Sequence, residues 1–372
     1  MSRILPFLGL LFIFSCSPQE LVEHNKELSD LDVSENRDTL HTVPSNTIEN
    51  RDKASILAYF DSLIDSRQLL VGQHCGDGPD ATKTYYDDYI NELADVTGRK
   101  VGIIGADFGF FPSTDYPVQT LIDHWNNGGL VTVSWHADNP FKEGYDVYWN
   151  SVENKEEIKL TALLSDAEKT KAWMNYRAEL DKVAGALQKL KEAGVTVIWR
   201  PFHEMNGDFF WWGINTYNNE QTNTTDYKAL WTDLYNTLRY SYGLDNLLWT
   251  YSVIPQQNWN ADVSAFYPGS DYVDLVGMDY YGETPSFPNY QKLKSLGKII
   301  VMSESGPSDK SYGNWDMMKV ADVLEGKAAY FLQWHSWSGA KVAIKDNKNT
   351  IEMMNSDAVI TLDELHIPEN LQ

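Results

Sequence analysis

Two glutamates, each at the end of an apolar stretch, have the chemistry that a hydrolytic site needs. Glu204 lies in Val195–Gly213 (VTVIWRPFHEMNGDFFWWG), which begins as an apolar run, breaks at Pro201 and continues into aromatic residues. Glu304 lies in Ile299–Gly306 (IIVMSESG), again behind an apolar run. A carboxylic acid can protonate a leaving oxygen, and aromatic rings stack on the apolar faces of sugars. Because glycosidases work with a pair of carboxyl groups, Glu204 and Glu304 together are typical of a site that cleaves glycosidic bonds.

Eight short apolar runs are the expected strands that position these residues. They are Leu69–Gly72, Val101–Gly105, Leu130–Trp135, Val195–Trp199, Asn246–Tyr251, Val273–Met278, Ile299–Met302 and Ala328–Trp334. Stretches with helical spacing lie between most of them. They are a helix from an N-cap at Thr47 or Asn50 to about Ser66, then Tyr85–Thr97, Val118–Asn126, Asp166–Ala193, Asp226–Tyr242, Asn289–Leu296 and Asp316–Leu324. This alternation of helices with continuously apolar strands predicts an α/β fold, a (β/α)8 TIM barrel with a single catalytic domain.

An open doubly wound sheet would also alternate strands and helices. The segment after the first run, His74–Asp80 (HCGDGPD), does not fit a glycine-rich phosphate-binding pattern, so the barrel is favoured. In such a barrel the active site is built at the carboxyl ends of the strands. Nearly every run is followed by a polar or aromatic residue suited to a sugar. These residues are His74, Asp107, His136, Glu204, Ser252, Asp279 with Tyr281, Glu304, and Trp334 with His335.

Composition excludes several classes of function. The net charge of −23 argues against nucleic acid and against polyanionic substrates, whereas a neutral polymer is unaffected by it. A metal-dependent hydrolase is disfavoured, because His203-Glu204 lacks the second His of an HExxH helix and Pro201 opposes a helix there. We expect no metal and no cofactor. Cys75 is expected to be a buried structural thiol.

The N-terminal segment predicts export. Residues 1–15 combine a basic Arg3 with an apolar stretch too short to span a membrane, as in a signal peptide. The sequence IFSC ending at Cys16 resembles a relaxed bacterial lipobox, so cleavage would leave Cys16 lipidated; simple secretion is the alternative. Residues 16–46 are polar and predict a flexible tether, followed by a catalytic domain over 47–372. These features place the protein in the bacterial cell envelope, lipid-anchored to the outer membrane and without other membrane attachment.

Several motifs resemble glycoside hydrolase family 26, whose members are mainly β-mannanases. The motifs are RPFHEMNG at Arg200–Gly207, WWG at Trp211–Gly213, SWH at Ser134–His136, GMDYYG at Gly277–Gly282 and SESG at Ser303–Gly306. The resemblance extends from about Ile56 to the C-terminus. Family members are barrel enzymes with catalytic carboxylates at strands four and seven, which matches the positions of Glu204 and Glu304 in the strand order above.

The resemblance implies a retaining double displacement, with Glu204 as general acid/base, Glu304 as nucleophile and their carboxyl groups about 5–5.5 Å apart. It implies that His203 and Tyr281 hold Glu304 and that Asp279 orients His203.

By the same likeness, His136 and Trp334 line the subsite of the reacting sugar, with Trp334 as stacking platform. Arg200 is expected to support the two carboxylates from beneath. Asp107, Phe209 and Trp212 complete the expected substrate-binding set, although the aromatic block could instead be core packing. Phe209 is a departure, because many members have Trp there. The insert Phe141–Leu164 is expected to form part of the cleft wall.

These observations lead to the hypothesis of a monomeric bacterial lipoprotein that hydrolyses internal β-1,4-mannosidic bonds. Its substrates would be mannan, glucomannan, galactomannan and manno-oligosaccharides. One alternative is the same machinery on another β-glycan, a mixed-linkage β-glucan or a β-1,3-xylan, since specificity depends on the loops. Another is a non-catalytic glycan-binding lipoprotein, which the presence of both carboxylates and His203 disfavours.

Overall fold

The computed structural model describes residues 51–110, 115–153, 155–214, 224–258 and 260–367. The predicted signal peptide, Cys16 and the tether therefore lie outside the described residues. Within these ranges no helix is long and apolar enough to cross a membrane.

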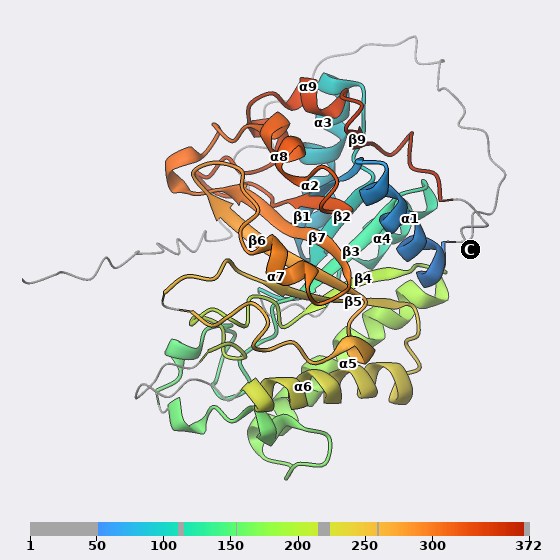
Figure 1. The fold of residues 1–372 in the computed structure, drawn as a ribbon. Coiled ribbons are helices and arrows are strands. Elements are labelled where there is room, and N and C mark those ends of the chain that lie inside the picture. The colour runs from blue at the N-terminus through green and yellow to red at the C-terminus, as the bar shows by residue number, and fades with distance from the viewer. Residues whose placement is uncertain (1–50, 111–114, 154, 215–223, 259, 368–372) are drawn as a thin grey trace, which may run out of the picture. The chain divides into compact units, whose positions relative to one another are not determined.

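Eight parallel strands form a closed barrel, and all eight were predicted as apolar runs. They are β1 (Leu69–Asp77), β2 (Ile103–Asp107), β3 (Leu130–Trp135), β4 (Val197–Pro201), β5 (Leu247–Val253), β6 (Leu275–Gly282), β7 (Ile299–Pro307) and β8 (Tyr330–Gln333). Each strand pairs with the next in the chain, and β1 closes the ring by pairing with both β2 and β8. A short β9 (Val359–Ile360), which the sequence did not predict, adds to the start of β1. The (β/α)8 barrel is confirmed (Figure 1).

Nine α-helices are described around and beside the strands. They are α1 (Lys53–Asp65), α2 (Pro79–Tyr86), α3 (Glu92–Thr97), α4 (Val118–Asn126), α5 (Lys171–Glu192), α6 (Thr224–Asn236), α7 (Tyr290–Lys294), α8 (Met317–Leu324) and α9 (Thr350–Met354). The expected start of the first helix at Thr47 or Asn50 is wrong. Its N-cap is Asp52, whose carboxylate accepts the Ser55 N–H at 2.9 Å.

The strands separate an aromatic outer core from a polar barrel interior. On β4, Trp199 stacks on Trp135 of β3 at 6.1 Å, and Trp135 in turn stacks on Tyr176 of α5. The next residue, Arg200, points the other way because successive side chains of a strand alternate between faces. Its guanidinium is 1% exposed and reaches carboxylates on β6 and β7. Because side chains alternate along β4, the charged Arg200 faces the barrel interior while its neighbour Trp199 packs in the outer aromatic core.

Irregular pairing occurs near the carboxyl ends of the strands that carry the carboxylates. The register of β7 shifts against β6 after Met302, where Ser303 has no partner, and it shifts against β8 between Met302 and Ser305. Such bulges redirect side chains and are common next to active sites. Beyond the shift, Asp279 pairs with Glu304, so two acidic residues lie side by side at one end of the barrel.

Candidate active site

The loop that carries Glu204 has an unusual backbone. Phe202 has φ +48° and Glu204 has φ +57°, a left-handed conformation that costs a non-glycine residue on the order of 1 kcal/mol or more. Hydrogen bonds from distant segments hold it. The Glu204 N–H donates to Ser252 O at 2.9 Å, and the Tyr227 hydroxyl donates to Phe202 O at 2.9 Å. The loop is therefore fixed by its surroundings, and Glu204 is placed by β5 and α6 as well as by its own strand.

Trp212 stabilises this loop from inside the protein. Its side chain is fully buried, and its indole N–H donates to the carbonyl of His203 at 2.8 Å. Its ring stacks on Phe210 at 4.5 Å. A side chain with no exposed surface does not contact a sugar, so the expectation that Trp212 binds substrate is corrected. Its role in this structure is to fix the backbone of His203.

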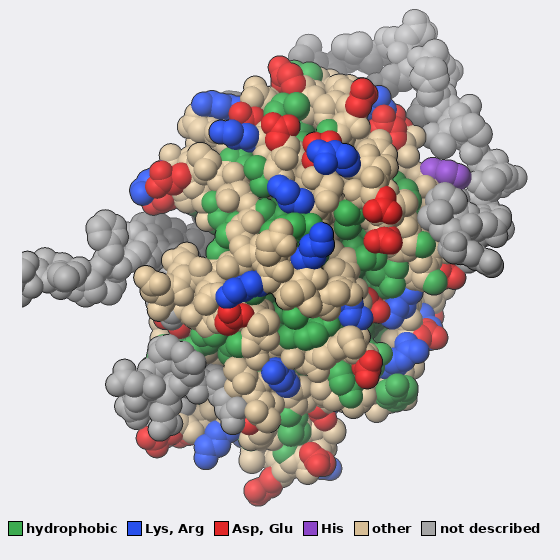
Figure 2. Space-filling model, in the orientation of Figure 1, with side chains coloured by type: hydrophobic (Ala, Val, Ile, Leu, Met, Phe, Trp, Pro, Cys, Tyr) green, Lys and Arg blue, Asp and Glu red, His purple; other side chains and the backbone are tan. Residues whose placement is uncertain are grey.

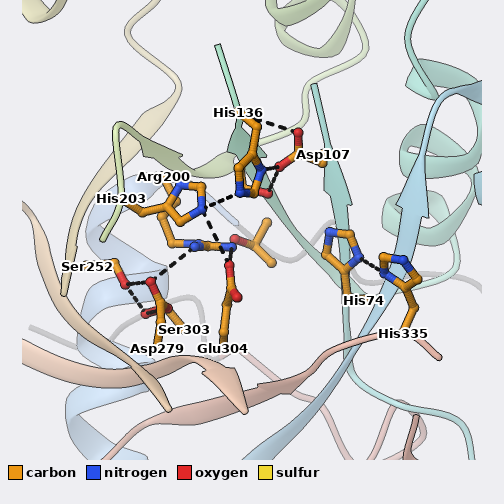
Figure 3. A network of polar contacts seen from close by, with 12 residues as sticks. His74, Asp107, His136, Arg200, His203, Ser252, Asp279, Ser303, Glu304 and His335 are labelled. Atoms are coloured by element: carbon orange, nitrogen blue, oxygen red, sulfur yellow. Dashed lines mark hydrogen bonds and ion pairs between the residues drawn. The ribbon is translucent and has the colours of Figure 1, made fainter. Parts of the chain in front are cut away.

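Glu304 is 4% exposed and has polar neighbours on three sides. Arg200 Nη2 lies 2.6 Å from its Oε1, and the Tyr281 hydroxyl donates to its Oε2 at 2.8 Å. His203 Nε2 lies 3.6 Å from Oε1. Figure 3 shows Glu304 directed at Arg200 and His203. The expectation that His203 and Tyr281 lie close to Glu304 is confirmed, and Arg200 and the Tyr281 hydroxyl stabilise its charged form.

Asp279 has a different role from the expected one. It accepts hydrogen bonds from Ser252 Oγ at 2.7 Å and Ser303 Oγ at 2.8 Å, and it lies 3.4 Å from Arg200 Nη1. Among the described residues its hydrogen bonds and ion pair go to these three side chains and not to His203, so the prediction that it orients His203 is wrong. Arg200 does support two carboxylates, but they are Glu304 and Asp279 rather than Glu304 and Glu204. Asp279 fixes the fork of the arginine that neutralises Glu304.

His203 is oriented instead by a chain of imidazoles that ends at Asp107. His136 Nδ1 lies 2.6 Å from Asp107 Oδ2, and His136 Nε2 lies 2.9 Å from His203 Nε2. Ser134 also donates to Asp107. Since the carboxylate accepts the Nδ1–H of His136, a neutral His136 accepts at Nε2, and we assign the proton between the rings to His203. Burial, followed by the charge of Arg200, holds the pKa of His203 well below its usual value.

Burial separates the expected substrate-binding residues into two groups. Asp107, His203, Trp212 and Asp279 are at most 1% exposed and act on their neighbours rather than on a ligand. His136 and Trp334, at 3% and 8%, retain some surface, and Phe209 and Tyr281 are half-buried. The second group is the one that can meet a sugar directly.

The aromatic side chains around the site come from distant segments. Trp334, which follows β8, stacks on His74 with 3.7 Å between ring centroids and an angle of 15°. Phe209 packs edge-on against Phe210 at 4.6 Å. Tyr148 of the insert stacks on the same Phe210 at 6.0 Å. The insert thus packs against the loop that carries Glu204, as a wall segment would.

The two glutamates have unequal surroundings. Burial and then the charge of Glu304 raise the pKa of Glu204 well above its usual range. Burial also raises the pKa of Glu304, to about 8, but Arg200 and the Tyr281 hydroxyl oppose that rise. Among the described residues, no donor or cation is paired with the Glu204 side chain. When the pair carries a single negative charge, that charge is therefore expected on Glu304 and the proton on Glu204.

Comparison with known proteins places this site in a family. The model of glycosyl hydrolase family 26 matches residues 45–364. The chain belongs to glycosyl hydrolase family 26. It is 31% identical over 339 residues to mannan endo-1,4-beta-mannosidase A and B of Caldalkalibacillus mannanilyticus, covering 86% of this chain and 63% of that protein. It is 36% identical over 259 residues to a mannan endo-1,4-beta-mannosidase of Bacillus subtilis, covering 66% and 69%.

A solved structure extends the comparison to the fold. A Bacillus subtilis mannanase superposes on 84% of this chain and 94% of its own, with a TM-score of 0.72 and 26% identity. The chain spans slightly less than two thirds of the first relative's length. The resemblance to family 26 and the barrel are thus both confirmed.

Two supporting residues of this family 26 site were missed by the sequence analysis. Ser303 precedes Glu304 and bonds Asp279, yet strand alternation would place it on the opposite face. Glu179 of α5 is half-buried and accepts hydrogen bonds from Trp135 Nε1 at 2.9 Å and Asp138 N at 3.0 Å. It anchors both sides of His136. Ser303 had a signal in its adjacency to Glu304, whereas nothing in the helix sequence distinguishes Glu179 from an exposed glutamate.

Among the described residues, no group of three or more His, Cys, Asp or Glu side chains is placed to hold a metal ion.

Replacing Tyr281 with Phe removes one hydrogen bond to Glu304 without changing the ring. Because the hydroxyl stabilises the charged carboxylate, its loss raises the pKa of Glu304. The acidic limb of the kcat/KM profile should therefore move to higher pH, and kcat should fall by about 10²-fold. The matched control is Tyr280→Phe on the same strand, since that hydroxyl donates to Thr284 O. An unshifted acidic limb in Tyr281→Phe would show that the hydroxyl does not tune the nucleophile.

Proposed function

We propose that this chain is a retaining β-mannanase that hydrolyses internal β-1,4-mannosidic bonds in mannan, glucomannan or galactomannan. The observation that carries the proposal is the unequal pair: Glu304 is held by Arg200 and Tyr281, while no described residue gives the partly buried Glu204 an ion pair or a hydrogen bond. One carboxyl group suited to attack and one suited to donate a proton are the requirements of a retaining glycosidase. The carboxyl separation of about 5–5.5 Å stays a prediction.

In the first step, a Glu304 oxygen attacks the anomeric carbon of the mannose unit at Trp334 while the glycosidic C–O bond breaks. Glu204 donates its proton to the departing oxygen, so the leaving chain departs as a neutral alcohol. The product is a mannosyl ester of Glu304. Forming that ester removes the negative charge that helped to raise the pKa of Glu204, so the pKa of Glu204 falls.

In the second step, the ionised Glu204 removes a proton from water, and the water oxygen attacks the anomeric carbon. The ester bond breaks, Glu304 regains its charge, and Glu204 is protonated again. Two inversions give net retention. During both steps Arg200 remains paired with Asp279, so its guanidinium stays in position while Glu304 loses its negative charge and then regains it.

The relatives support mannan as the substrate, because those compared above are named as mannosidases or mannanases. The net charge of −23 suits a neutral polysaccharide. The same carboxylates would also act on a mixed-linkage β-glucan or a β-1,3-xylan, but no relative compared above is named for either. A binding protein without catalysis is disfavoured by the ion pair and hydrogen bond that Glu304 retains.

The test is reducing-sugar release from unsubstituted β-1,4-mannan, with mixed-linkage β-glucan and β-1,3-xylan in parallel. We expect release from mannan at rates at least tenfold above the other two. The product ladder from the same reactions distinguishes mid-chain from terminal cleavage. Release from β-glucan or β-1,3-xylan with mannan intact would show that the substrate is that glycan instead of mannan. No release from any of the three would overturn the function.

We also propose that the protein is a monomer anchored to the bacterial outer membrane, on its periplasmic or outer face, through a lipid on Cys16 after removal of residues 1–15. The lipobox-like IFSC and the polar tether support this proposal. Expression of the full chain in a bacterium fed labelled palmitate should give a labelled, membrane-associated protein. Cys16→Ser should lose the label; retention of the label would contradict the proposal.

A further inference from the structure

Glu179 is a glutamate on the inward face of α5 that has no role in the steps above. Figure 2 shows acidic and basic side chains scattered over the outer surface on the face that it presents. Glu179 lies instead three residues after the buried Tyr176 and four before the buried Val183, so the helical period places it on their side of α5. It is half-buried and forms no ion pair with any described residue. A carboxylate placed there gives up part of its hydration, which hydrogen bonds must replace.

Both oxygens of the Glu179 carboxylate face the strand end that carries His136. Oε1 accepts the indole N–H of Trp135 at 2.9 Å, and Oε1 and Oε2 each lie 3.0 Å from Asp138 N. Partial burial raises the pKa of Glu179 to about 8, and these hydrogen bonds oppose that rise. The bonds join α5 to the residue before His136 and to the second residue after it. One side chain therefore holds both ends of a short segment.

This contact acts from outside the barrel on a side chain inside it. Trp135 packs against Tyr176 of α5, and His136 faces the interior because side chains alternate along β3. His136 Nδ1 lies 2.6 Å from Asp107 Oδ2, and its Nε2 lies 2.9 Å from His203 Nε2. Figure 3 shows its ring between these two partners. A shift of about 0.5 Å away from His203 would take the second bond beyond the usual range.

The position of His136 matters to the reaction through His203. His203 Nε2 lies 3.6 Å from Glu304 Oε1, so the ring that His136 orients is a neighbour of the nucleophile. Glu179 is thus linked to Glu304 through two imidazoles, and each link is a contact within the structure. A small misplacement of groups at an active site can cost a large factor in rate.

Two other donors hold the same segment, but they act on its carbonyl groups. They are Trp211 Nε1, 2.9 Å from Ala137 O, and the Tyr145 hydroxyl, 3.3 Å from His136 O. Loss of Glu179 would deprive the two N–H donors of the acceptor that the structure gives them, and the contacts to the carbonyl groups supply none. Glu179 therefore has a part in fixing this segment that the other contacts do not duplicate.

We propose that Glu179 is a positioning residue of the active site, which holds the backbone on both sides of His136 so that this ring bonds Asp107 and His203 at once. It touches neither the substrate nor the reacting atoms. The role requires an acceptor at this position rather than a charge, so a neutral amide of the same size should serve. The effect on geometry is independent of the reaction, whereas the effect on turnover rests on the proposed function.

The geometry is tested by proton NMR of the full chain labelled with ¹⁵N-histidine. The hydrogen bond of 2.6 Å to Asp107 should move the Nδ1–H proton of His136 far downfield of the amide region, and its loss in His136→Gln assigns it. Glu179→Met keeps the length of the side chain and removes both oxygen acceptors, so this resonance should shift upfield or broaden beyond detection. Glu179→Gln keeps one oxygen and should keep the resonance close to its wild-type position.

Turnover gives the second readout. Glu179→Met should lower kcat on β-1,4-mannan by about 10- to 100-fold with a smaller change in KM, because misplacement acts mainly on the transition state. Glu179→Gln should restore kcat to within about threefold of the wild type. The control is Glu192→Ala on the same helix, since Glu192 is exposed and accepts a hydrogen bond from Gln188 at 3.1 Å. It should change neither the resonance nor kcat.

A second variant keeps the test decisive if Glu179→Met fails to fold, which melting curves of all variants will show. Trp135→Phe retains an aromatic ring for the stack on Trp199 and removes one of the donors to Glu179. It should shift the His136 resonance upfield. An unchanged resonance in folded Trp135→Phe would then overturn the proposal.

The remaining outcomes separate the positioning role from the proposed function. A lower melting temperature in Glu179→Met, with the resonance and kcat of the folded protein unchanged, would show that Glu179 only stabilises the fold and would overturn the proposal. Equal losses in Glu179→Met and Glu179→Gln would also contradict it, since the acceptor would not be what matters. If the wild type does not hydrolyse mannan but the resonance responds to Glu179 as expected, the proposed function fails and the positioning role stands.

Discussion

Replacing Glu304 with Gln is expected to lower kcat on β-1,4-mannan by roughly 10⁴-fold or more, since the glycosyl ester cannot form. Gln keeps the size of the side chain and its hydrogen bond from Tyr281, so the protein should fold. Arg200 would still be paired with Asp279. The measurement is reducing-sugar release at saturating mannan, together with a melting curve.

The matched control is Glu325→Gln. Glu325 forms a surface ion pair with Arg67 at 3.1 Å and should be replaceable with no effect on kcat. If Glu304→Gln retained more than a few per cent of wild-type kcat, another group would have to be the nucleophile, and the assignment at β7 would be wrong.

Replacing Glu204 with Ala is expected to lower kcat on mannan by about 10²–10⁴-fold, because the leaving alcohol must then depart without a proton. The effect on the first step with dinitrophenyl β-mannobioside should be much smaller, because that leaving group needs no proton. The second step should remain slow, since no base activates the water. A burst of dinitrophenol followed by slow turnover is therefore expected.

Added azide sharpens this result. A small anion that needs no general base should occupy the space of the missing carboxylate, accelerate turnover and yield β-mannosyl azide. On mannan, by contrast, Glu204→Ala should remain inactive even with azide, because the first step limits the rate there. Equal losses on both substrates, with no azide product, would show that Glu204 acts on the fold rather than as acid and base.

The pH dependence follows from the same pair. The acid form of Glu204 is active, and its raised pKa keeps it protonated at neutral pH. Raising the pH through that pKa removes the proton and should lower activity on mannan. Lowering the pH protonates Glu304 and should also lower activity, giving a bell-shaped profile. In Glu204→Ala the alkaline limb should disappear from the first step with the dinitrophenyl substrate.

The barrel was predictable because its strands are buried on both faces. Such strands read as continuous apolar runs, and Leu130–Trp135 coincides with β3 from end to end. The two-residue β9 is too short to show any period. For the first helix, Thr47, Asn50 and Asp52 are all good caps, so local propensity did not identify the one in use.

The catalytic pair was predictable, but its support was only partly so. Glu204 and Glu304 follow from residue type and strand order. The role of Asp279 did not follow, because an extra residue in β7 shifts its register against β6 and β8 and changes the alternation that a sequence argument assumes. Within the run of aromatic residues, nothing marks Trp212 as buried and Phe209 as half-buried. That distinction depends on the path of a loop whose backbone has positive φ at two non-glycine residues.

The most direct test of the account is the configuration of the product formed from manno-oligosaccharides by the wild-type protein. Proton NMR of the anomeric region, recorded in the first minutes of hydrolysis of mannohexaose, reports which anomer appears before mutarotation mixes the two. The account predicts that the β-anomer appears first, because two displacements at one carbon retain configuration. Initial formation of the α-anomer would contradict the assignment of Glu304 as nucleophile, and the absence of hydrolysis would contradict the mannanase itself.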